Sequence, residues 1–144
     1  MKTVLFLCTG NYFRSRFAEG LFNALAERAG LDWRADSAGL MTDYNPGNIG
    51  PISPETVREL ARRDIVLEQP LRHPRQVRAA DLAGAARVIA LNESQHRPML
   101  ADQFPAWADR AEYWHIPDLG WWPARHSLGA IEREVEALIQ ELSA

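Results

Sequence analysis

The segment Cys8–Ser15, which reads CTGNYFRS, constrains the fold more than any other part of this chain. It follows an apolar run over residues 4–7 and precedes a stretch with helical spacing that starts near Arg14, so the local order is strand, tight loop and helix. Such a loop directs its backbone N–H groups toward one point, and the N-terminus of the following helix adds positive potential. Gly10 permits close approach and positive φ, and Asn11 tolerates left-handed geometry. The segment therefore predicts an oxyanion-binding loop.

This loop starts with a thiol and ends with a guanidinium. Arg14 matches two oxygens of a phosphoryl group at once. Cationic neighbours and a helix N-terminus favour the thiolate, which is the nucleophilic form of cysteine, so Cys8 is a candidate nucleophile. A lone cysteine after a strand is more often a small buried hydrophobic residue. The preceding strand, the Gly10–Asn11 pair, Ser15 and the helix together favour the catalytic interpretation.

The composition sets the class of protein that we expect. The chain has 144 residues, which fits one domain over residues 1–144, and its net charge of -3 gives no basic footprint for nucleic acid. The single cysteine excludes an intrachain disulfide and favours a reducing compartment. The N-terminal apolar run is too short for a signal peptide, and we see no span for a membrane. We therefore expect a cytoplasmic enzyme without nucleic-acid or membrane partners, and its oligomeric state stays open.

Apolar runs and amphipathic stretches alternate along the chain. We expect strands over residues 3–8, 33–37, 87–91 and 111–116, and helices over residues 14–29, 53–64, 92–103 and 127–142. This alternation predicts an α/β fold, namely a single domain with a four-stranded parallel doubly wound sheet and helices on both faces. Cys8, Ser37, Leu91 and Asp118 fall at or just after predicted strand ends. Because ligands of such sheets bind beyond the carboxyl ends of the strands, the fold and the loop indicate the same edge.

Several short motifs, in this order and spacing, resemble the low-molecular-weight protein tyrosine phosphatases over almost the whole chain. The matching segments are Val4–Asn11, Arg14–Ser15, Asp36–Gly39, His73 with Arg75–Gln76, and Pro117–Asp118. The resemblance implies that Cys8 attacks phosphorus to form a cysteinyl-phosphate, that Arg14 binds phosphate oxygens, and that Asp118 is the general acid and base. It implies a phosphate-binding loop that consists of Thr9, Gly10, Asn11, Tyr12, Phe13, Arg14 and Ser15. We expect no metal and no cofactor, because this loop supplies the positive charge.

The resemblance also implies residues that support the loop and residues that line a substrate cleft. Ser15 donates to the Cys8 sulfur in this interpretation, and the loop is supported by Asn11, Ser15, Ser37 and His73. Ser37 as a turn cap and His73 as a surface histidine are equally good interpretations, and Asp118 could be a turn residue. The expected cleft residues are Tyr12, Tyr44, Trp121 and Trp122, since two tryptophans in a Gly/Pro loop are more readily explained as a binding wall than as core. His96, His115 and His126 show no partner pattern.

The sequence departs from the family pattern at some positions and leaves alternatives open. Phe13 stands where many members have a second cysteine, Arg16 where proline is common, and Leu119 follows Asp118 where proline is usual. The expected substrate is a phosphotyrosine protein or a small aryl phosphate. One alternative is an arsenate reductase that uses an external small thiol, since related reductases share the loop. Another is a phosphate-binding module without catalysis.

Overall fold

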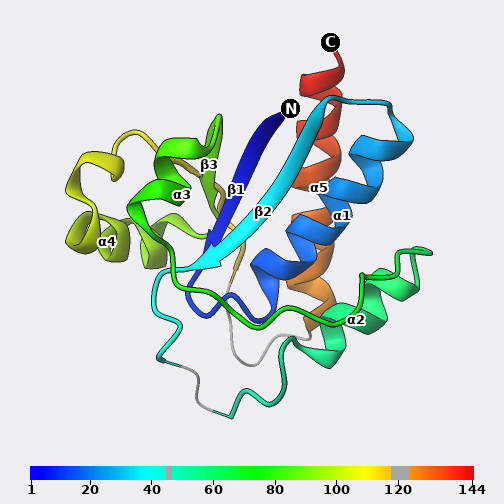
Figure 1. Cartoon of the computed structure of the whole chain (residues 1–144), viewed down its shortest axis with the longest axis horizontal. Coiled ribbons are helices and arrows are strands. Elements are labelled where there is room, and N and C mark those ends of the chain that lie inside the picture. Colours follow the sequence, from blue (N-terminus) through cyan, green and yellow to red (C-terminus); the bar gives the residue numbers. More distant parts are fainter. Residues whose placement is uncertain (45–46, 118–123) are drawn as a thin grey trace.

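The computed structural model of the protein describes residues 1–44, 47–117 and 124–144, with the backbone alone at residues 124 and 125 (Figure 1). Its elements are β1 (Lys2–Cys8), α1 (Arg14–Arg28), β2 (Trp33–Gly39), α2 (Pro54–Ala61), α3 (Ala79–Gly84), β3 (Arg87–Ala90), α4 (Glu93–Gln103), the 3-10 helix η1 (Pro105–Trp107), β4 (Glu112–Tyr113) and α5 (Ala124–Ser143). None of the described helices is long and apolar enough to cross a membrane.

The four strands form one parallel sheet in the order β2-β1-β3-β4. Because β1 lies between β2 and β3, it pairs along both edges and carries Cys8 to the centre of the sheet's carboxyl edge. In that register Cys8 is opposite Gly39, the last residue of β2. The predicted four-stranded parallel sheet, with the loop directly after the first strand, is confirmed.

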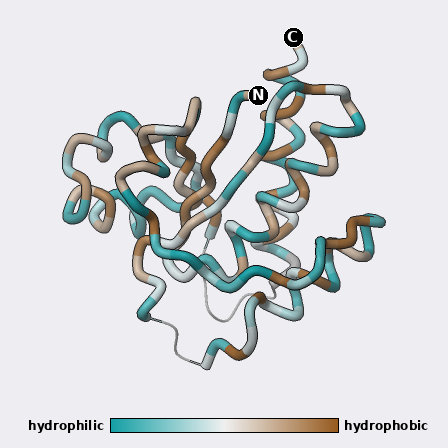
Figure 2. Tube along the Cα trace, in the orientation of Figure 1, coloured by the Kyte–Doolittle hydropathy of each residue, from teal (hydrophilic) through white to brown (hydrophobic). Residues whose placement is uncertain are grey.

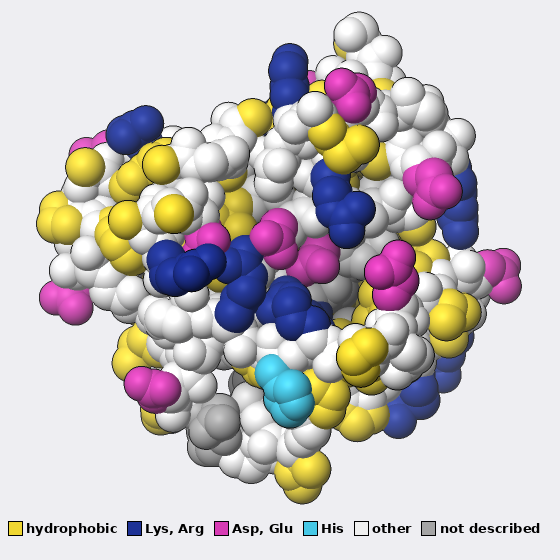
Figure 3. Space-filling view, viewed as in Figure 1, with side chains coloured by type: hydrophobic (Ala, Val, Ile, Leu, Met, Phe, Trp, Pro, Cys, Tyr) yellow, Lys and Arg dark blue, Asp and Glu magenta, His cyan; other side chains and the backbone are white. Residues whose placement is uncertain are grey.

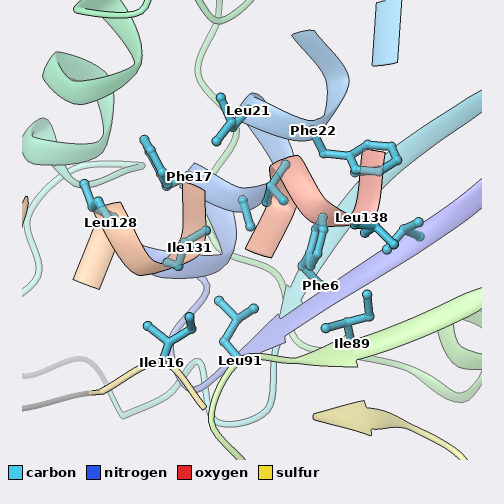
Figure 4. Packing of buried hydrophobic residues seen from close by; sticks show 14 of the residues in the cluster. Phe6, Phe17, Leu21, Phe22, Ile89, Leu91, Ile116, Leu128, Ile131 and Leu138 are labelled. Carbon is cyan, nitrogen blue, oxygen red and sulfur yellow. The ribbon is translucent and has the colours of Figure 1, made fainter. Parts of the chain in front are cut away.

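Helices cover both faces of the sheet. Figure 1 shows α1 and α5 side by side on one face and α3 and α4 on the other. Alternate residues of β1 therefore enter different cores: Val4 and Phe6 face α1 and α5, whereas Leu5 and Leu7 face the α3 and α4 side. Figure 2 shows that hydrophobic residues gather along β1 and β3, and Figure 4 shows the α1–α5 core around Phe6. Burial on both faces explains the continuous apolar run of β1.

The ends of the helices follow the local signals in the sequence. Gly30 has φ 68° directly after the C-cap of α1, at the C′ position where glycine is favoured. The Asn92 side chain accepts a hydrogen bond from the Gln95 N–H and so caps α4. Ser53 precedes Pro54 at the start of α2, as predicted, but its side chain makes no capping hydrogen bond.

Two features differ from the sequence expectation. Helix α3 was not expected, because its Ala-rich segment is only six residues long; Asp81 supports its start by accepting a hydrogen bond from the Arg78 N–H. The fourth strand is shorter than the expected 111–116, since only Glu112–Tyr113 pairs with β3. Beyond it, His115 forms an isolated antiparallel bridge with Asn92.

Candidate active site

The loop between β1 and α1 holds its thiol against two hydrogen-bonding groups. The Cys8 Sγ lies 2.9 Å from the Ser15 Oγ and 3.3 Å from the Asn11 backbone nitrogen. Of the two residues expected to permit left-handed geometry, Asn11 adopts it, with φ 52°. This conformation turns the Asn11 N–H toward the sulfur. Both the Ser15 hydroxyl and the Asn11 N–H can donate a hydrogen bond to the sulfur.

The rest of the loop forms a cradle for an anion. Within the part of the chain that the structure describes, the backbone N–H groups of Gly10, Tyr12 and Phe13 have no hydrogen-bond partner. Helix α1 begins immediately afterwards at Arg14, without a side-chain N-cap. The Arg14 guanidinium is buried, and its Nη1 and Nη2 both lie 3.4 Å from the Gln95 Oε1 of α4. Unpaired N–H groups, a helix N-terminus and a guanidinium suit a phosphoryl group.

A hydrogen-bonded network around Asn11 supports the loop, and we call it the Asn11 network. Its members are Asn11, Ser15, Glu19, Ser37 and Arg72. The Asn11 amide donates to Ser15 and to Ser37, at 2.9 Å each, and its Oδ1 accepts from Arg72 Nη1 at 3.0 Å. Ser37 donates to Glu19 at 2.5 Å, and Arg72 also donates to both of these residues. Three separate segments of the chain, namely the loop with α1, β2 and the segment around Arg72, therefore meet at one asparagine.

Arg72 takes the place in this network that the sequence had suggested for His73. The His73 side chain is exposed, and it makes no hydrogen bond in the described part of the chain. Its backbone carbonyl instead accepts from Arg72 Nη1 at 2.9 Å. Adjacent side chains of a non-helical segment point in different directions, so only one of the two can face Asn11. Figure 3, which views the molecule as in Figure 1, shows Lys/Arg and Asp/Glu side chains gathered at the centre of the face toward the viewer.

A second arginine is buried beneath the loop. Arg16 donates to the backbone carbonyls of Asn11, Pro51 and Arg72, at 3.4, 3.1 and 2.6 Å. Burial and the charge of Arg72 lower the pKa of Arg16 to about 10, against the opposing effect of Glu19 and Cys8. Arg16 therefore stays charged at neutral pH and ties the loop to the segments on either side of α2.

The geometry agrees with a comparison against known proteins. Residues 3–144 match the family described as low molecular weight phosphotyrosine protein phosphatase. The chain belongs to this family.

Relatives in the family differ in their named substrates. The chain is 33% identical over 107 residues to a protein-arginine-phosphatase of Bacillus subtilis, which covers 74% of this chain and 66% of the relative. It is 36% identical over 94 residues to the low molecular weight protein-tyrosine-phosphatase YfkJ of the same organism, which covers 64% of this chain and 57% of the relative. These matches thus span less than two thirds of either relative. The solved structure of a low molecular weight protein tyrosine phosphatase from T. tengcongensis has a TM-score of 0.77 and 32% identity, over 99% of this chain and 97% of that one.

The remaining predicted residues of this family member differ in how far they are buried, and some lie outside the described residues. Tyr12 is half-buried, and its hydroxyl donates to the Ile49 carbonyl at 2.6 Å and accepts from the Ile49 N–H at 3.3 Å. Phe13 packs against the α1–α5 core. Tyr44 is 64% exposed on the segment before Ile49. The expected acid and the expected tryptophan walls, Asp118, Trp121 and Trp122, lie outside the described residues.

Helix α4 contributes residues that the sequence alone did not connect to the loop. The buried His96 lies with its Nε2 3.2 Å from the Thr9 Oγ1, and its Nδ1 accepts from the Asn92 N–H. Because Nδ1 is an acceptor, the neutral ring carries its proton on Nε2 and donates it to Thr9. Asn92 also donates to the Ile116 carbonyl at 2.8 Å, two residues before Asp118. The missing signal was the pairing of β1 with β3, which brings the first turn of α4 to the loop.

A cavity of about 660 Å³ lies between α1, the edge of β2 and the segment after α2. It is separate from the phosphate cradle, because residues 8–15 do not line it. Its lining includes Arg16, Glu19 and Arg72, of which Glu19 and Arg72 belong to the Asn11 network. The cavity therefore borders the network that supports this phosphatase-family loop.

Proposed function

We propose that this protein hydrolyses phosphotyrosine or related aryl phosphate monoesters through a cysteinyl-phosphate intermediate. The observation that carries the proposal is the position of the Cys8 Sγ, 2.9 Å from the Ser15 Oγ and 3.3 Å from the Asn11 nitrogen, at the base of a loop with unpaired N–H groups. A thiolate so held is a nucleophile that faces an anion cradle. Family membership supports the same class of reaction.

In the first step the Cys8 thiolate attacks phosphorus, a P–S bond forms and the P–O bond to the aryl group breaks. Arg14 and the loop N–H groups bind the equatorial oxygens and stabilise the charge that redistributes in the transition state. Asp118 gives its proton to the leaving phenolate. This general-acid step contributes a factor of roughly 10²–10⁴.

In the second step water attacks the phosphorus of the cysteinyl-phosphate. Asp118, now a carboxylate, accepts a proton from that water, and the P–S bond breaks to release phosphate and the thiolate. Ser15 and the Asn11 N–H stabilise the departing thiolate through the contacts that they make with the sulfur.

The charges around the loop favour an aryl phosphate over a phosphoguanidine. Among the described residues, Arg14, Arg16 and Arg72 lie at or below the loop, and the carboxylate beside them, Glu19, is bonded within the Asn11 network. A phosphoarginine brings a further positive group, whereas a phosphotyrosine brings a flat neutral ring that can pack on Tyr12. Phosphoarginine is the second candidate, because one relative is named a protein-arginine-phosphatase.

The decisive assay is hydrolysis of p-nitrophenyl phosphate by the wild type, Cys8→Ser and Arg14→Lys. We expect turnover by the wild type alone, with vanadate still bound by Cys8→Ser, because a serine hydroxyl is a poor nucleophile and a lysine cannot replace a planar fork. Substantial activity of Cys8→Ser would refute the covalent mechanism. Phosphate binding without turnover by the wild type would indicate a binding module, and arsenate-dependent thiol consumption an arsenate reductase.

Two further comparisons test the acid and the substrate. Asp118→Asn should slow phosphotyrosine hydrolysis far more than p-nitrophenyl phosphate hydrolysis, because a poor leaving group needs the proton most. Equal slowing would assign Asp118 a structural role. Peptides with phosphotyrosine, phosphoarginine and phosphoserine at one position should be hydrolysed in the order phosphotyrosine, phosphoarginine, phosphoserine, since the serine ester is too short for a deep cleft. A faster reaction of phosphoarginine would reverse the assignment.

A further inference from the structure

The direction of the hydrogen bonds at Asn11 is determined by two neighbours that can only donate. Its Oδ1 lies 3.0 Å from the Arg72 Nη1 and 3.1 Å from the Arg75 backbone nitrogen. A guanidinium and a backbone N–H have no acceptor atom. The amide oxygen must therefore face them, and the amide Nδ2 must face Ser15 and Ser37.

This orientation decides what the Ser15 hydroxyl does. Because Ser15 accepts a hydrogen bond from the Asn11 Nδ2, its one proton is available for the Cys8 sulfur at 2.9 Å. If the Asn11 amide were reversed, its oxygen would accept the Ser15 proton, and Ser15 could no longer donate to Cys8. The amide nitrogen would then also face Arg72, donor against donor.

Ser37 and Glu19 complete the Asn11 network. Ser37 accepts from Asn11 and from Arg72, at 2.9 and 3.1 Å, so its proton goes to the Glu19 carboxylate. Glu19 also accepts from the Arg72 Nη2 at 3.2 Å and so holds the guanidinium in place. Arg72 thus bonds to three of the four other members of the Asn11 network.

We propose that Arg72 is a positioning residue for the Cys8 thiolate: together with the Arg75 N–H it orients the Asn11 amide, which obliges Ser15 to donate its proton to the sulfur. The inference rests on the proposed function in that it takes Cys8 to be the nucleophile. Among the described residues, the charged and titratable groups in and around the Asn11 network are Arg14, Arg16 and Glu19 of α1, Asp36 of β2, Arg72, Arg75, and His96 of α4.

The test is the rate of Cys8 alkylation by iodoacetamide between pH 4.5 and 9, followed by intact mass. The chain has a single cysteine, so no other thiol reacts, and the neutral reagent needs no anion cradle. Arg72→Met should lower the rate at pH 6 about tenfold and move the rise of the profile to higher pH, with the high-pH plateau unchanged. Arg72→Lys keeps the positive charge but loses the planar guanidinium with its several N–H donors, and it should lower the alkylation rate at pH 6 about threefold. Arg78→Met, at an exposed arginine outside the Asn11 network, is the matched control and should leave the pH profile of alkylation unchanged.

The Arg72→Met substitution in a Ser15→Ala protein distinguishes a positioning effect of Arg72 from an effect of its charge. If Arg72 acts through Ser15, then Arg72→Met should produce almost no further shift in a Ser15→Ala protein, because the hydrogen bond it controls is already absent. An equal shift in both backgrounds would show that Arg72 acts through its charge and would overturn the proposal, as would an unchanged profile of folded Arg72→Met. If Arg72→Met does not fold, Arg72→Lys in both backgrounds carries the same comparison. Alkylation requires no substrate, so failure of the phosphatase proposal would appear separately, as absent turnover by the wild type.

Discussion

At the scale of single residues, Asn11 is the most constrained position of the loop. It is fully buried, its backbone is left-handed at φ 52°, and its side-chain amide uses both oxygen lone pairs and both protons. A left-handed non-glycine residue costs of order 1–3 kcal/mol and persists only where its surroundings hold it. Here the surroundings are the Asn11 network, so this strain is confined to the site where the thiol is held.

Cys8 should be vulnerable to peroxide in a particular way. A thiolate in an open anion cradle reacts with peroxide to a sulfenic acid, and without a second cysteine no intramolecular disulfide can trap it. We expect poor recovery of activity by dithiothreitol after peroxide alone, and good recovery when glutathione is present during exposure. Intact mass distinguishes the sulfinic acid from the glutathione adduct.

Full recovery after prolonged exposure to excess peroxide alone, with no glutathione or dimer adduct, would contradict this expectation. It would mean that the loop shields Cys8 or stabilises its sulfenic acid.

At the scale of elements, the end of β2 is packed directly against the phosphate loop. A Cβ added at Gly39 would lie 2.9 Å from the Thr9 carbonyl oxygen and 3.1 Å from the Asn11 Cβ. Gly39→Ala should therefore displace the loop, with a fall in kcat/KM of about 10–100-fold and a loss of about 1–3 kcal/mol in unfolding free energy. Gly84→Ala is the control, because a Cβ there meets nothing within 4 Å. Wild-type activity of Gly39→Ala would show that the loop tolerates displacement.

Helix α5 is tied to the segment after α2 by a paired contact. Arg63 Nε and Nη2 donate to the two carboxylate oxygens of Glu132, at 2.6 and 3.0 Å. The Arg63 hydrogen bonds lower the pKa of Glu132 below its ordinary 4.5, against the opposing effect of burial. A lowered folded-state pKa means that the pair stabilises above pH 4.5 and that this contribution is lost as the pH falls through the folded value.

Glu132→Gln should consequently lose about 0.5–1.5 kcal/mol of unfolding free energy at pH 7, and the difference from wild type should narrow below pH 4.5. Urea unfolding at both pH values measures it. Glu136→Gln, on the exposed face of the same helix, should show no such loss. A difference that stays constant with pH would attribute the effect to packing and not to charge.

At the scale of the whole molecule, β1 joins the two cores and the active loop. Phe6 is fully buried between sheet and helices, with its ring centroid 6.1 Å from Phe22 and 5.5 Å from Trp114. Phe6→Ala should cost about 3–5 kcal/mol, a large part of the roughly 5–15 kcal/mol typical of a domain. Val66→Ala, at a side chain that is 86% exposed, should change the free energy by less than about 0.5 kcal/mol. A small effect of Phe6→Ala in urea unfolding would show that the core repacks.

The sequence by itself determined the elements and the loop, because their signals are local. Apolar runs, the Gly30 stop, the Asn92 cap and the CTGNYFRS segment act through residues within a few positions of one another. Parallel connectivity followed from the alternation of strands and helices. Helix α3 was not predicted, because six residues are too few to show a helical periodicity of apolar residues.

Only the tertiary structure decided which distant residues support the thiol. Arg72 reaches Asn11 across 61 positions and His96 reaches Thr9 across 87, and both contacts depend on strand order and register. The choice of Arg72 over His73 depends on which way one side chain points in a non-helical segment. No periodic pattern encodes that direction, because it is set by packing against α1 and β2 once the sheet has formed.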